Sequence, residues 1–285
     1  MEHMIVADHV SEWCASQRAE GLRIGLVPTM GAFHDGHLSL IRRARVECDR
    51  VVVYLFVNPL QFGSDQDLAM YPKDVARDEV LAESLGADLF FTPTLEDMYP
   101  HGYPPPASDV IHPGPLGDRL EGQARPGHFE GVLTVVHRLF AIAGPCHAYF
   151  GEKDAQQLFL ISEMAAARFP DVEVVACATV REPGGLAMSS RNSHLSEEER
   201  RTAGSLSAGL FAAERLFTSG ERDAAALVEE ALQPMRAEPG VEVDYVVVVD
   251  PETFESTERI GEEAIVLVAA HVGPARLIDN VRLAG

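Results

Sequence analysis

Two histidines stand three residues apart in a short segment near the N-terminus. Residues 28–37 read Pro-Thr-Met-Gly-Ala-Phe-His-Asp-Gly-His, between the apolar runs 24–27 and 38–41. This pattern predicts a strand, a glycine-containing turn and a helix start, where backbone N–H groups and the helix dipole attract anions. A protonated imidazole of His34 or His37 could offset the charge that builds on a triphosphate as a P–O bond breaks. The segment therefore predicts an anion-binding site with two proton donors.

Two other interpretations of these histidines stay open. Imidazoles at i and i+3 can bind zinc, but no third ligand lies at a familiar metal spacing, and we predict no metal site built by the protein. His34 and His37 could also be surface side chains without a role. The flanking Gly31 and Gly36 favour a binding site instead, because glycine lets the backbone approach a ligand where a Cβ would obstruct.

The composition argues against several classes of partner. The 285 residues include 44 Asp and Glu against 23 Lys and Arg, a formal charge of −21. Nucleic acids and anionic membranes require a basic surface, so we expect neither as a partner. The four widely spaced cysteines are typical of reduced thiols, and the sequence shows neither a signal-peptide pattern nor an apolar run of 18 residues. We expect a soluble, cytoplasmic protein.

Strand-like runs alternate with helical patterns over the first 180 residues. Strands are expected at 23–27, 51–57, 89–91, 148–150 and 172–176, and helices at 38–48, 74–85, 131–141 and 154–167. This order predicts an α/β fold, in which a parallel sheet is covered by helices on both faces. Ligands bind beyond the carboxyl ends of such strands, where the most informative loops fall.

The pattern changes after about residue 180. Ser196 and Glu199 predict a capping box for a helix that ends near Gly220. A second helix is expected over 223–235, followed by short strands at 243–249, 264–269 and 276–278. We therefore expect two domains, residues 1–180 and a smaller α+β domain of residues 181–285.

An amide side chain follows the second expected strand. Gln61 comes two residues after Asn58-Pro59, and its carboxamide has a donor and an acceptor suited to a hydroxyl and a carboxylate of a small polar acid. A solvated loop glutamine is the alternative. Asn58 itself has the residue type of a turn former, which is the commoner role of Asn-Pro.

Two later segments combine glycine with charged or hydroxyl side chains. Residues 151–157 read Gly-Glu-Lys-Asp-Ala-Gln-Gln, and Lys153 is one of only two lysines in the chain. Lys153 could reach a phosphate, and Asp154 could cap a helix or hold a ribose hydroxyl; a capped helix with an exposed lysine is the alternative. Residues 188–191, Met-Ser-Ser-Arg, could close over a triphosphate, or they could form a plain linker.

Together these motifs resemble one enzyme family over nearly the whole chain. The segments 28–37, 56–62, 125–129, 151–157, 188–192 and 276–280 are similar to those of the pantoate:β-alanine ligases, the pantothenate synthetases. The resemblance implies a Rossmann-like, nucleotidyltransferase-like fold and a two-step reaction. ATP and (R)-pantoate give an enzyme-bound pantoyl adenylate and pyrophosphate, and β-alanine then displaces AMP to form pantothenate, a precursor of coenzyme A.

The resemblance also implies roles for particular residues. His37 is the implied proton donor, with His34, Lys153 and Arg191 as further catalytic candidates. Gln61 and Gln157 would hold pantoate, and Gln61 would also meet β-alanine. The residues implied in ATP binding are Met30, Gly31, Ala32, Phe33, His34, Asp35, Gly36, His37, Gly151, Glu152, Lys153, Asp154, Val180, Met188, Ser189, Ser190 and Arg191.

Family resemblance further implies a homodimer and Mg²⁺ bound with the nucleotide phosphates. Lys73 stands where the family usually has arginine, and His194 stands where it usually has tyrosine. Two other functions stay open from the sequence. One is a different adenylyl or nucleotidyl transferase of the His-x-x-His type, acting on another small acid, and the other is a nucleotide-binding regulator without chemistry.

Overall fold

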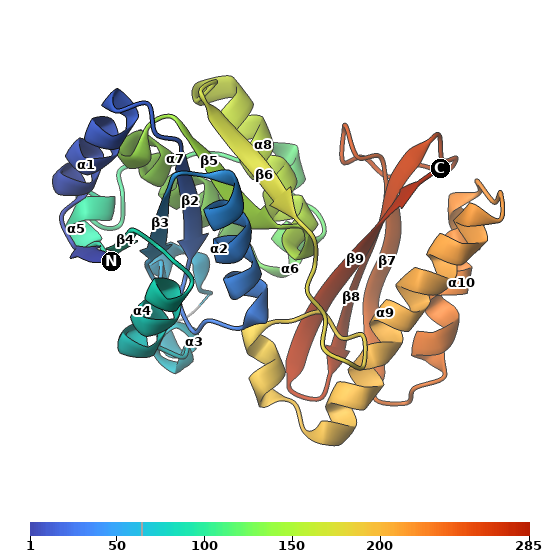
Figure 1. Cartoon of the computed structure of the whole chain (residues 1–285). Coiled ribbons are helices and arrows are strands. Elements are labelled where there is room, and N and C mark those ends of the chain that lie inside the picture. The colour runs from blue at the N-terminus through green and yellow to red at the C-terminus, as the bar shows by residue number, and fades with distance from the viewer. Residues whose placement is uncertain (64) are drawn as a thin grey trace. The chain divides into compact units, whose positions relative to one another are not determined.

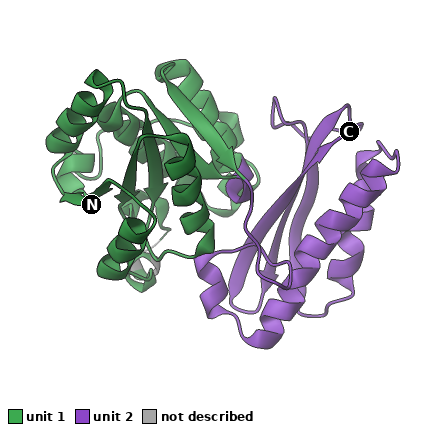
Figure 2. Ribbon diagram, in the orientation of Figure 1, with its two compact units in different colours: residues 1–151, 156–177 green, residues 152–155, 178–285 purple. Residues whose placement is uncertain are grey.

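The computed structural model describes residues 1–63 and 65–285, whose contacts divide the chain into two compact units. Unit 1 comprises residues 1–151 and 156–177, and unit 2 comprises residues 152–155 and 178–285 (Figure 2). The short segment 152–155 therefore belongs to unit 2, although unit 1 precedes and follows it in sequence. The expected pair of domains, residues 1–180 and 181–285, stays a prediction.

The described residues of unit 1 form a six-stranded, fully parallel sheet in the order β1-β4-β3-β2-β5-β6 (Figure 1). Its strands are β1 (Glu2–Met4), β2 (Ile24–Thr29), β3 (Arg50–Leu55), β4 (Leu89–Phe91), β5 (Cys146–Gly151) and β6 (Val172–Cys177). The predicted α/β class and parallel sheet are confirmed. Strand β1 was not predicted from the sequence.

Helices cover both faces of this sheet because successive strand residues point to opposite sides. Leu26 lies in one core with α1, α7 and α8, whereas its neighbour Val27 lies in the other core with α2 and α4. The helices of unit 1 are α1 (Ala7–Ala19), α2 (Asp35–Glu47), α3 (Asp65–Met70), α4 (Val75–Ser84), α5 (Leu95–Met98), α6 (Glu121–Ala124), α7 (His128–Ala143) and α8 (Ala155–Arg168).

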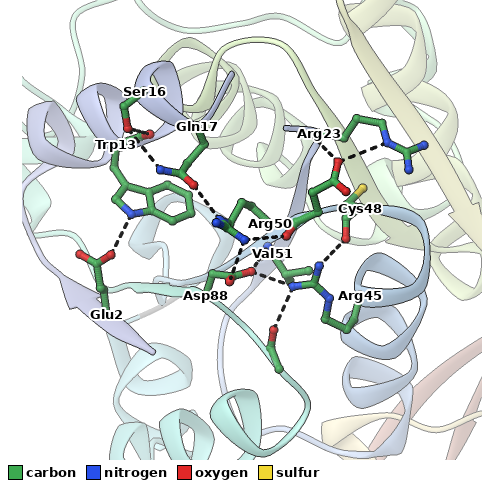
Figure 3. Close-up of polar contacts among 12 residues, drawn as sticks. Glu2, Trp13, Ser16, Gln17, Arg23, Arg45, Cys48, Arg50, Val51 and Asp88 are labelled. Carbon is green, nitrogen blue, oxygen red and sulfur yellow. Dashed lines mark hydrogen bonds and ion pairs between the residues drawn. The ribbon is translucent and has the colours of Figure 1, made fainter. Parts of the chain in front are cut away.

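A polar network holds the amino ends of the central strands (Figure 3). The Asp88 carboxylate accepts the Val51 backbone N–H at 2.8 Å and pairs with Arg45 of α2 at 2.8 Å. Arg50 donates to the Gln17 side chain of α1 at 2.6 Å. Helices from both faces are thus tied to the same edge, which leaves the opposite edge, after β2 and β3, for the polar loops predicted from the sequence.

The described part of unit 2 has a three-stranded antiparallel sheet with two helices. Its strands, in the order β7-β8-β9, are β7 (Val241–Val249), β8 (Glu263–Val272) and β9 (Ala275–Ala284), and its helices are α9 (Glu197–Thr218) and α10 (Ala224–Arg236). The capping box predicted at Ser196 and Glu199 is present. Strand β9 is much longer than the expected 276–278, because buried Asp279 and Asn280 continue it without an apolar pattern.

Close packing of α9 on α10 generates a stability prediction at Gly209. Helix propensity alone would make Gly209→Ala stabilising by about 1 kcal/mol. A Cβ there would, however, lie 2.1 Å from the Ala231 carbonyl oxygen and 2.8 Å from the Met235 Cε. We expect a net loss of about 1–3 kcal/mol from overpacking, measured as a lower urea midpoint.

The exposed neighbour Ala208 provides the control for this prediction. Ala208→Gly changes helix propensity without a steric clash and should cost no more than about 1 kcal/mol. A Gly209→Ala variant as stable as the wild type would contradict the observed packing.

Candidate functional site

The segment that carries both histidines joins β2 to α2, as predicted. His34 is the N-cap residue of α2, and its Nδ1 accepts the Gly36 backbone N–H at 3.2 Å. In return, the His37 Nδ1 accepts the His34 backbone N–H at 3.4 Å, and the ring centroids lie 4.1 Å apart. The two side chains form a reciprocal capping box, the arrangement usually made by Ser or Thr with Glu or Gln.

This capping arrangement determines which ring nitrogen is available to a ligand. The Nδ1 atoms of His34 and His37 are engaged with backbone N–H groups. Nε2 of each ring is therefore the atom able to donate to a ligand.

Buried Asp78 of α4 holds the turn that precedes α2. Its carboxylate accepts the backbone N–H groups of Ala32 at 2.7 Å and Phe33 at 2.9 Å. Burial raises the pKa of Asp78, while these two N–H donors oppose that rise. Ala32 adopts a positive φ of 53°, which is uncommon for a residue other than glycine. The two charge-assisted bonds explain how this turn is held in place.

Gly31, directly before Ala32, meets two constraints at once. Its φ is +84°, and a Cβ would lie 3.1 Å from the Asp78 carboxylate. The side chain of Phe33 is 2% exposed and packs in the core with α2. Within the predicted ATP-binding segment 30–37, the Phe33 side chain is therefore part of the core.

Gln61 lies at the end of a one-turn helix, Pro59–Gln61, that is fixed by buried polar contacts. Asn58 caps this turn through Leu60 N–H at 3.2 Å, and it also donates to the Gly131 carbonyl at 3.0 Å and accepts from the Tyr99 hydroxyl at 2.6 Å. Asn58 is thus the turn former that its sequence suggested, and it also ties the Gln61 segment to α7.

Two side chains from the 125–129 segment fix the backbone of Gln61. Arg125 donates to the Gln61 carbonyl oxygen at 3.3 Å, and His128 Nδ1 lies 3.3 Å from the same oxygen. Gly131 allows the close approach, because a Cβ there would lie 2.5 Å from the Leu60 carbonyl oxygen. The Gln61 backbone is therefore held from two directions.

The neighbouring glutamines at the start of α8 have different surroundings. Gln156 is buried, accepts the Glu121 backbone N–H at 3.1 Å and donates to the carbonyls of Leu116 and Arg119 at 2.8 and 3.0 Å. Its carboxamide is occupied in holding the 116–121 segment. Gln157 is half-buried and remains the predicted ligand-binding glutamine of the pair.

In unit 2, the backbone of the Lys153 segment is held by strand β9. The Asn280 side-chain amide donates to the carbonyl oxygens of Glu152 at 2.8 Å and Lys153 at 2.9 Å. Residues Glu152–Asp154 form a 3₁₀ turn, and the side chains of Lys153 and Asp154 are half-buried. The expected phosphate-binding lysine therefore lies on a fixed backbone.

The other predicted segment of unit 2 lies on a loop closed by backbone contacts. The Met188 N–H donates to the Val180 carbonyl at 2.9 Å, which brings these two predicted residues together. Ser189 caps the turn Ser190–His194 by accepting the Arg191 N–H at 3.3 Å, and Arg191 is exposed. Buried Asn192 anchors this turn through Glu182 at 2.8 Å and the Ala187 carbonyl at 3.0 Å.

The structure thus brings the predicted residues together within each unit. In unit 1, Met30 to His37 follow β2 and Gln61 follows the adjacent β3, so both lie beyond the carboxyl edge of one sheet. In unit 2, the segments at 152–154 and 188–191 are each held by a buried asparagine, and Val180 is joined to Met188 by a backbone hydrogen bond. Asp78 was missed, because one acidic residue in a helix carries no local signal. Asn280 lies in the 276–280 segment of the family resemblance, but the sequence assigned it no role.

Neither a metal cluster nor a membrane span is found among the described residues. Among the residues whose side chains the structure describes, 1–63, 66 and 68–285, no group of three or more His, Cys, Asp or Glu is placed to hold a metal ion. Over the same ranges, every helix is too short or too polar to cross a lipid bilayer.

Comparison with known proteins gives matches that extend over almost the full chain. A family model described as pantoate-β-alanine ligase matches residues 4–282. The chain is 49% identical to a pantothenate synthetase of Thermotoga petrophila over 276 residues, covering 97% of both chains. It is 50% identical to a pantothenate synthetase of Rubrobacter xylanophilus over 278 residues, covering 96% of both.

Solved structures of the same description share the fold. A crystal structure of pantothenate synthetase from Thermus thermophilus is 42% identical, with a TM-score of 0.87 and 99% of each chain covered. A pantoate-β-alanine ligase from Francisella tularensis, complexed with β-γ ATP and β-alanine, is 32% identical with a TM-score of 0.76. That match covers 99% of this chain and 97% of the other.

The carboxylate of Asp78 generates a prediction about the turn it holds. Asp78→Asn keeps the shape but removes the charge and one of the two acceptor contacts to the Ala32 and Phe33 N–H groups. Hydrogen bonds to a charged group contribute about 1.5–3 kcal/mol, so these two amides should exchange with solvent about 10- to 100-fold faster. Hydrogen exchange of the free protein, followed by NMR, measures this.

Asp74 provides the matched control on the same helix. It caps α4 by accepting the Arg77 N–H, a role that asparagine fills equally well. Asp74→Asn should leave the exchange of Ala32 and Phe33 unchanged. Unaltered exchange in Asp78→Asn would show that the turn is held by something else.

Proposed function

This chain belongs to the pantoate-β-alanine ligase family, and from that membership we propose that it joins (R)-pantoate to β-alanine at the expense of ATP. The observation that carries the proposal is the family match over residues 4–282, which includes every predicted site residue. The products are pantothenate, AMP and pyrophosphate, formed through an enzyme-bound pantoyl adenylate.

In the first step, a pantoate carboxylate oxygen attacks the α-phosphorus of ATP. The bond from that phosphorus to the bridging oxygen breaks, and pyrophosphate leaves with the electron pair. We assign to His34 and His37 the donation of Nε2–H hydrogen bonds to phosphate oxygens, with His37 as the proton donor. The N–H groups and dipole at the start of α2 favour the same negative charge.

In the second step, the β-alanine amine attacks the acyl carbon of the adenylate. The bond from that carbon to the AMP oxygen breaks, and the nitrogen loses a proton as the amide forms. We assign Gln61 and Gln157 to pantoate and Gln61 also to β-alanine, because a carboxamide can both donate and accept. Alignment of the amine with the acyl carbon then accounts for much of the rate.

The state of the cysteines agrees with a mechanism that lacks an enzyme thioester. All four cysteines are buried. Burial raises the pKa of Cys14 to about 11 and that of Cys146 to about 12, so neither forms a thiolate at neutral pH. Activation of the acid as its adenylate requires no covalent enzyme nucleophile.

We propose ATP-binding residues in each unit of the chain. In unit 1, we assign ATP binding to Met30, Gly31, Ala32, Phe33, His34, Asp35, Gly36, His37 and Gly151. In unit 2, we assign it to Glu152, Lys153, Asp154, Val180, Met188, Ser189, Ser190 and Arg191. Lys153 and Arg191 would neutralise phosphate charge as pyrophosphate departs.

We further propose that the nucleotide substrate is MgATP and that the enzyme acts as a cytoplasmic homodimer. Mg²⁺ keeps much of its coordination for waters and phosphate oxygens, so it enters with the substrate. Support for ATP and β-alanine as ligands comes from the Francisella tularensis relative, whose structure contains both β-γ ATP and β-alanine.

An omission assay tests this function. The purified protein is incubated with ATP, Mg²⁺, pantoate and β-alanine, and with each component left out in turn. We expect pantothenate only in the complete mixture, with AMP and pyrophosphate formed in equal amounts. Pyrophosphate release that does not depend on pantoate would instead indicate another adenylyl or nucleotidyl transferase.

His37 provides the sharpest mutational prediction. His37→Ala should lower turnover by about 10²- to 10⁴-fold, the range for a lost proton donor or charge stabiliser. Because alanine also removes half of the capping box, His37→Gln is the matched variant, since glutamine at this position can accept the N-cap N–H. His37→Gln should keep the melting temperature near that of the wild type and still lose turnover. Near-normal turnover in either variant contradicts the assigned role.

A further inference from the structure

We propose that Asn280 is a positioning residue that sets the direction of the Lys153 side chain for the ATP-dependent half-reaction. This inference rests on the proposed function for its kinetic part, although its geometric part stands on contacts within unit 2. Asn280 lies on β9, 127 residues after Lys153. It is 8% exposed, and its amide nitrogen faces the Lys153 turn.

The argument begins with the two carbonyl groups that Asn280 contacts. Its Nδ2 lies 2.8 Å from the Glu152 oxygen and 2.9 Å from the Lys153 oxygen. The Glu152 carbonyl belongs to the peptide plane before the Lys153 Cα, and the Lys153 carbonyl belongs to the plane after it. Because peptide units are rigid planes, holding both of them restricts the φ and ψ of Lys153. The starting direction of its side chain is restricted as a result.

A restricted starting direction matters because lysine is otherwise poorly ordered. Its ammonium is a compact charge on a flexible four-carbon stem. The side chain itself cannot select one position, so the backbone from which it starts must restrict the volume that the charge reaches. Misplacement of a catalytic group by about 1 Å can cost about 10²-fold in rate.

Asn280 is itself held in place by its neighbour Asp279. The Asp279 carboxylate accepts the Asn280 backbone N–H at 2.8 Å and forms a two-pronged ion pair with Arg181. Burial raises the pKa of Asp279, whereas the positive charges of Arg181 and Lys153 oppose that rise.

This pair of residues also connects the two predicted nucleotide-binding segments of unit 2. Asp279 holds Arg181, which directly follows Val180 and whose backbone bridges to Ala187. Asn280 holds the 152–153 backbone. Adjacent residues on one strand thus order both segments, which explains why β9 carries a buried polar pair at 279–280.

Two substitutions remove the amide donors in different ways. Asn280→Ala leaves a small cavity, whereas Asn280→Leu fills the space with a side chain of similar branching and no donor. Both should lower the rate constant of pyrophosphate release with pantoate about 10- to 100-fold. Arg282→Ala is the matched control, because Arg282 lies on the same strand and pairs at the surface with Glu263. It should leave the rate unchanged.

A double-mutant cycle tests whether Asn280 acts through Lys153. In the Lys153→Ala background, Asn280→Ala should lower the rate by less than about twofold, because the group that it positions is gone. Equal losses in both backgrounds would overturn the proposal and show that Asn280 affects the rate by another route. Supplying preformed pantoyl adenylate should restore pantothenate formation in Asn280→Ala.

A substrate-free measurement separates this inference from the proposed function. The chain has only two lysines, Lys73 and Lys153. Reductive methylation with ¹³C-formaldehyde therefore gives two dimethyl-lysine signals besides that of the N-terminal amine, and Lys73→Arg assigns them. In Asn280→Ala and Asn280→Leu, the Lys153 signal should narrow and shift toward that of free dimethyl-lysine, while the Lys73 signal stays unchanged.

The outcomes of this measurement are distinct. A changed Lys153 signal in a protein that makes no pantothenate supports the positioning contact and contradicts the proposed function. An unchanged Lys153 signal in an enzyme that makes pantothenate overturns the positioning contact alone. If the alanine variant does not fold, the leucine variant provides the same comparison without a cavity.

Discussion

The start of α2 depends on one exchange of hydrogen bonds between two histidines and the backbone. The first N–H groups of a helix have no partner within it, and at this helix the side chains of His34 and His37 accept some of them through Nδ1. The same contacts leave Nε2 as the ring nitrogen able to donate. The same hydrogen bonds therefore cap α2 and determine which ring nitrogen can donate to an anion. The i, i+3 spacing serves both, because a capping box requires it.

Buried polar side chains hold the backbone of the other predicted segments in a similar way. Asp78 accepts two N–H groups of the β2–α2 turn, Asn58 holds the turn that ends in Gln61, and Asn280 holds the turn that contains Lys153. In each case a buried polar side chain binds the backbone of a segment far away in sequence. Such bonds are strong in a buried setting, and leaving one partner unpaired is costly. The loops can therefore keep a defined shape without a regular element of their own.

The sequence predicted the parts of the fold that depend on local pattern. The β2–turn–α2 unit and the capping box at Ser196 follow from short-range rules, and both are present. Helix α1 was missed because it buries only Ala7, Val10 and Cys14 and so lacks a clear apolar face. Strand β9 was predicted too short because Asp279 and Asn280 are satisfied by residues about 100 positions or more away. Nothing near them in sequence indicates those partners, and the same holds for Asp78.

Because residues 152–155 belong to unit 2, the proposed phosphate-binding groups are positioned by different units of the chain. In sequence, Lys153 follows β5 directly and would be counted with the parallel sheet. Its backbone, however, is bonded to β9, so its position is set by unit 2. The histidine donors are set by unit 1 through α2 and Asp78. The groups proposed to act on phosphate are therefore positioned by two separately packed cores. A substitution within the core of unit 2 can then alter the placement of Lys153 without disturbing the hydrogen bonds of His34 and His37.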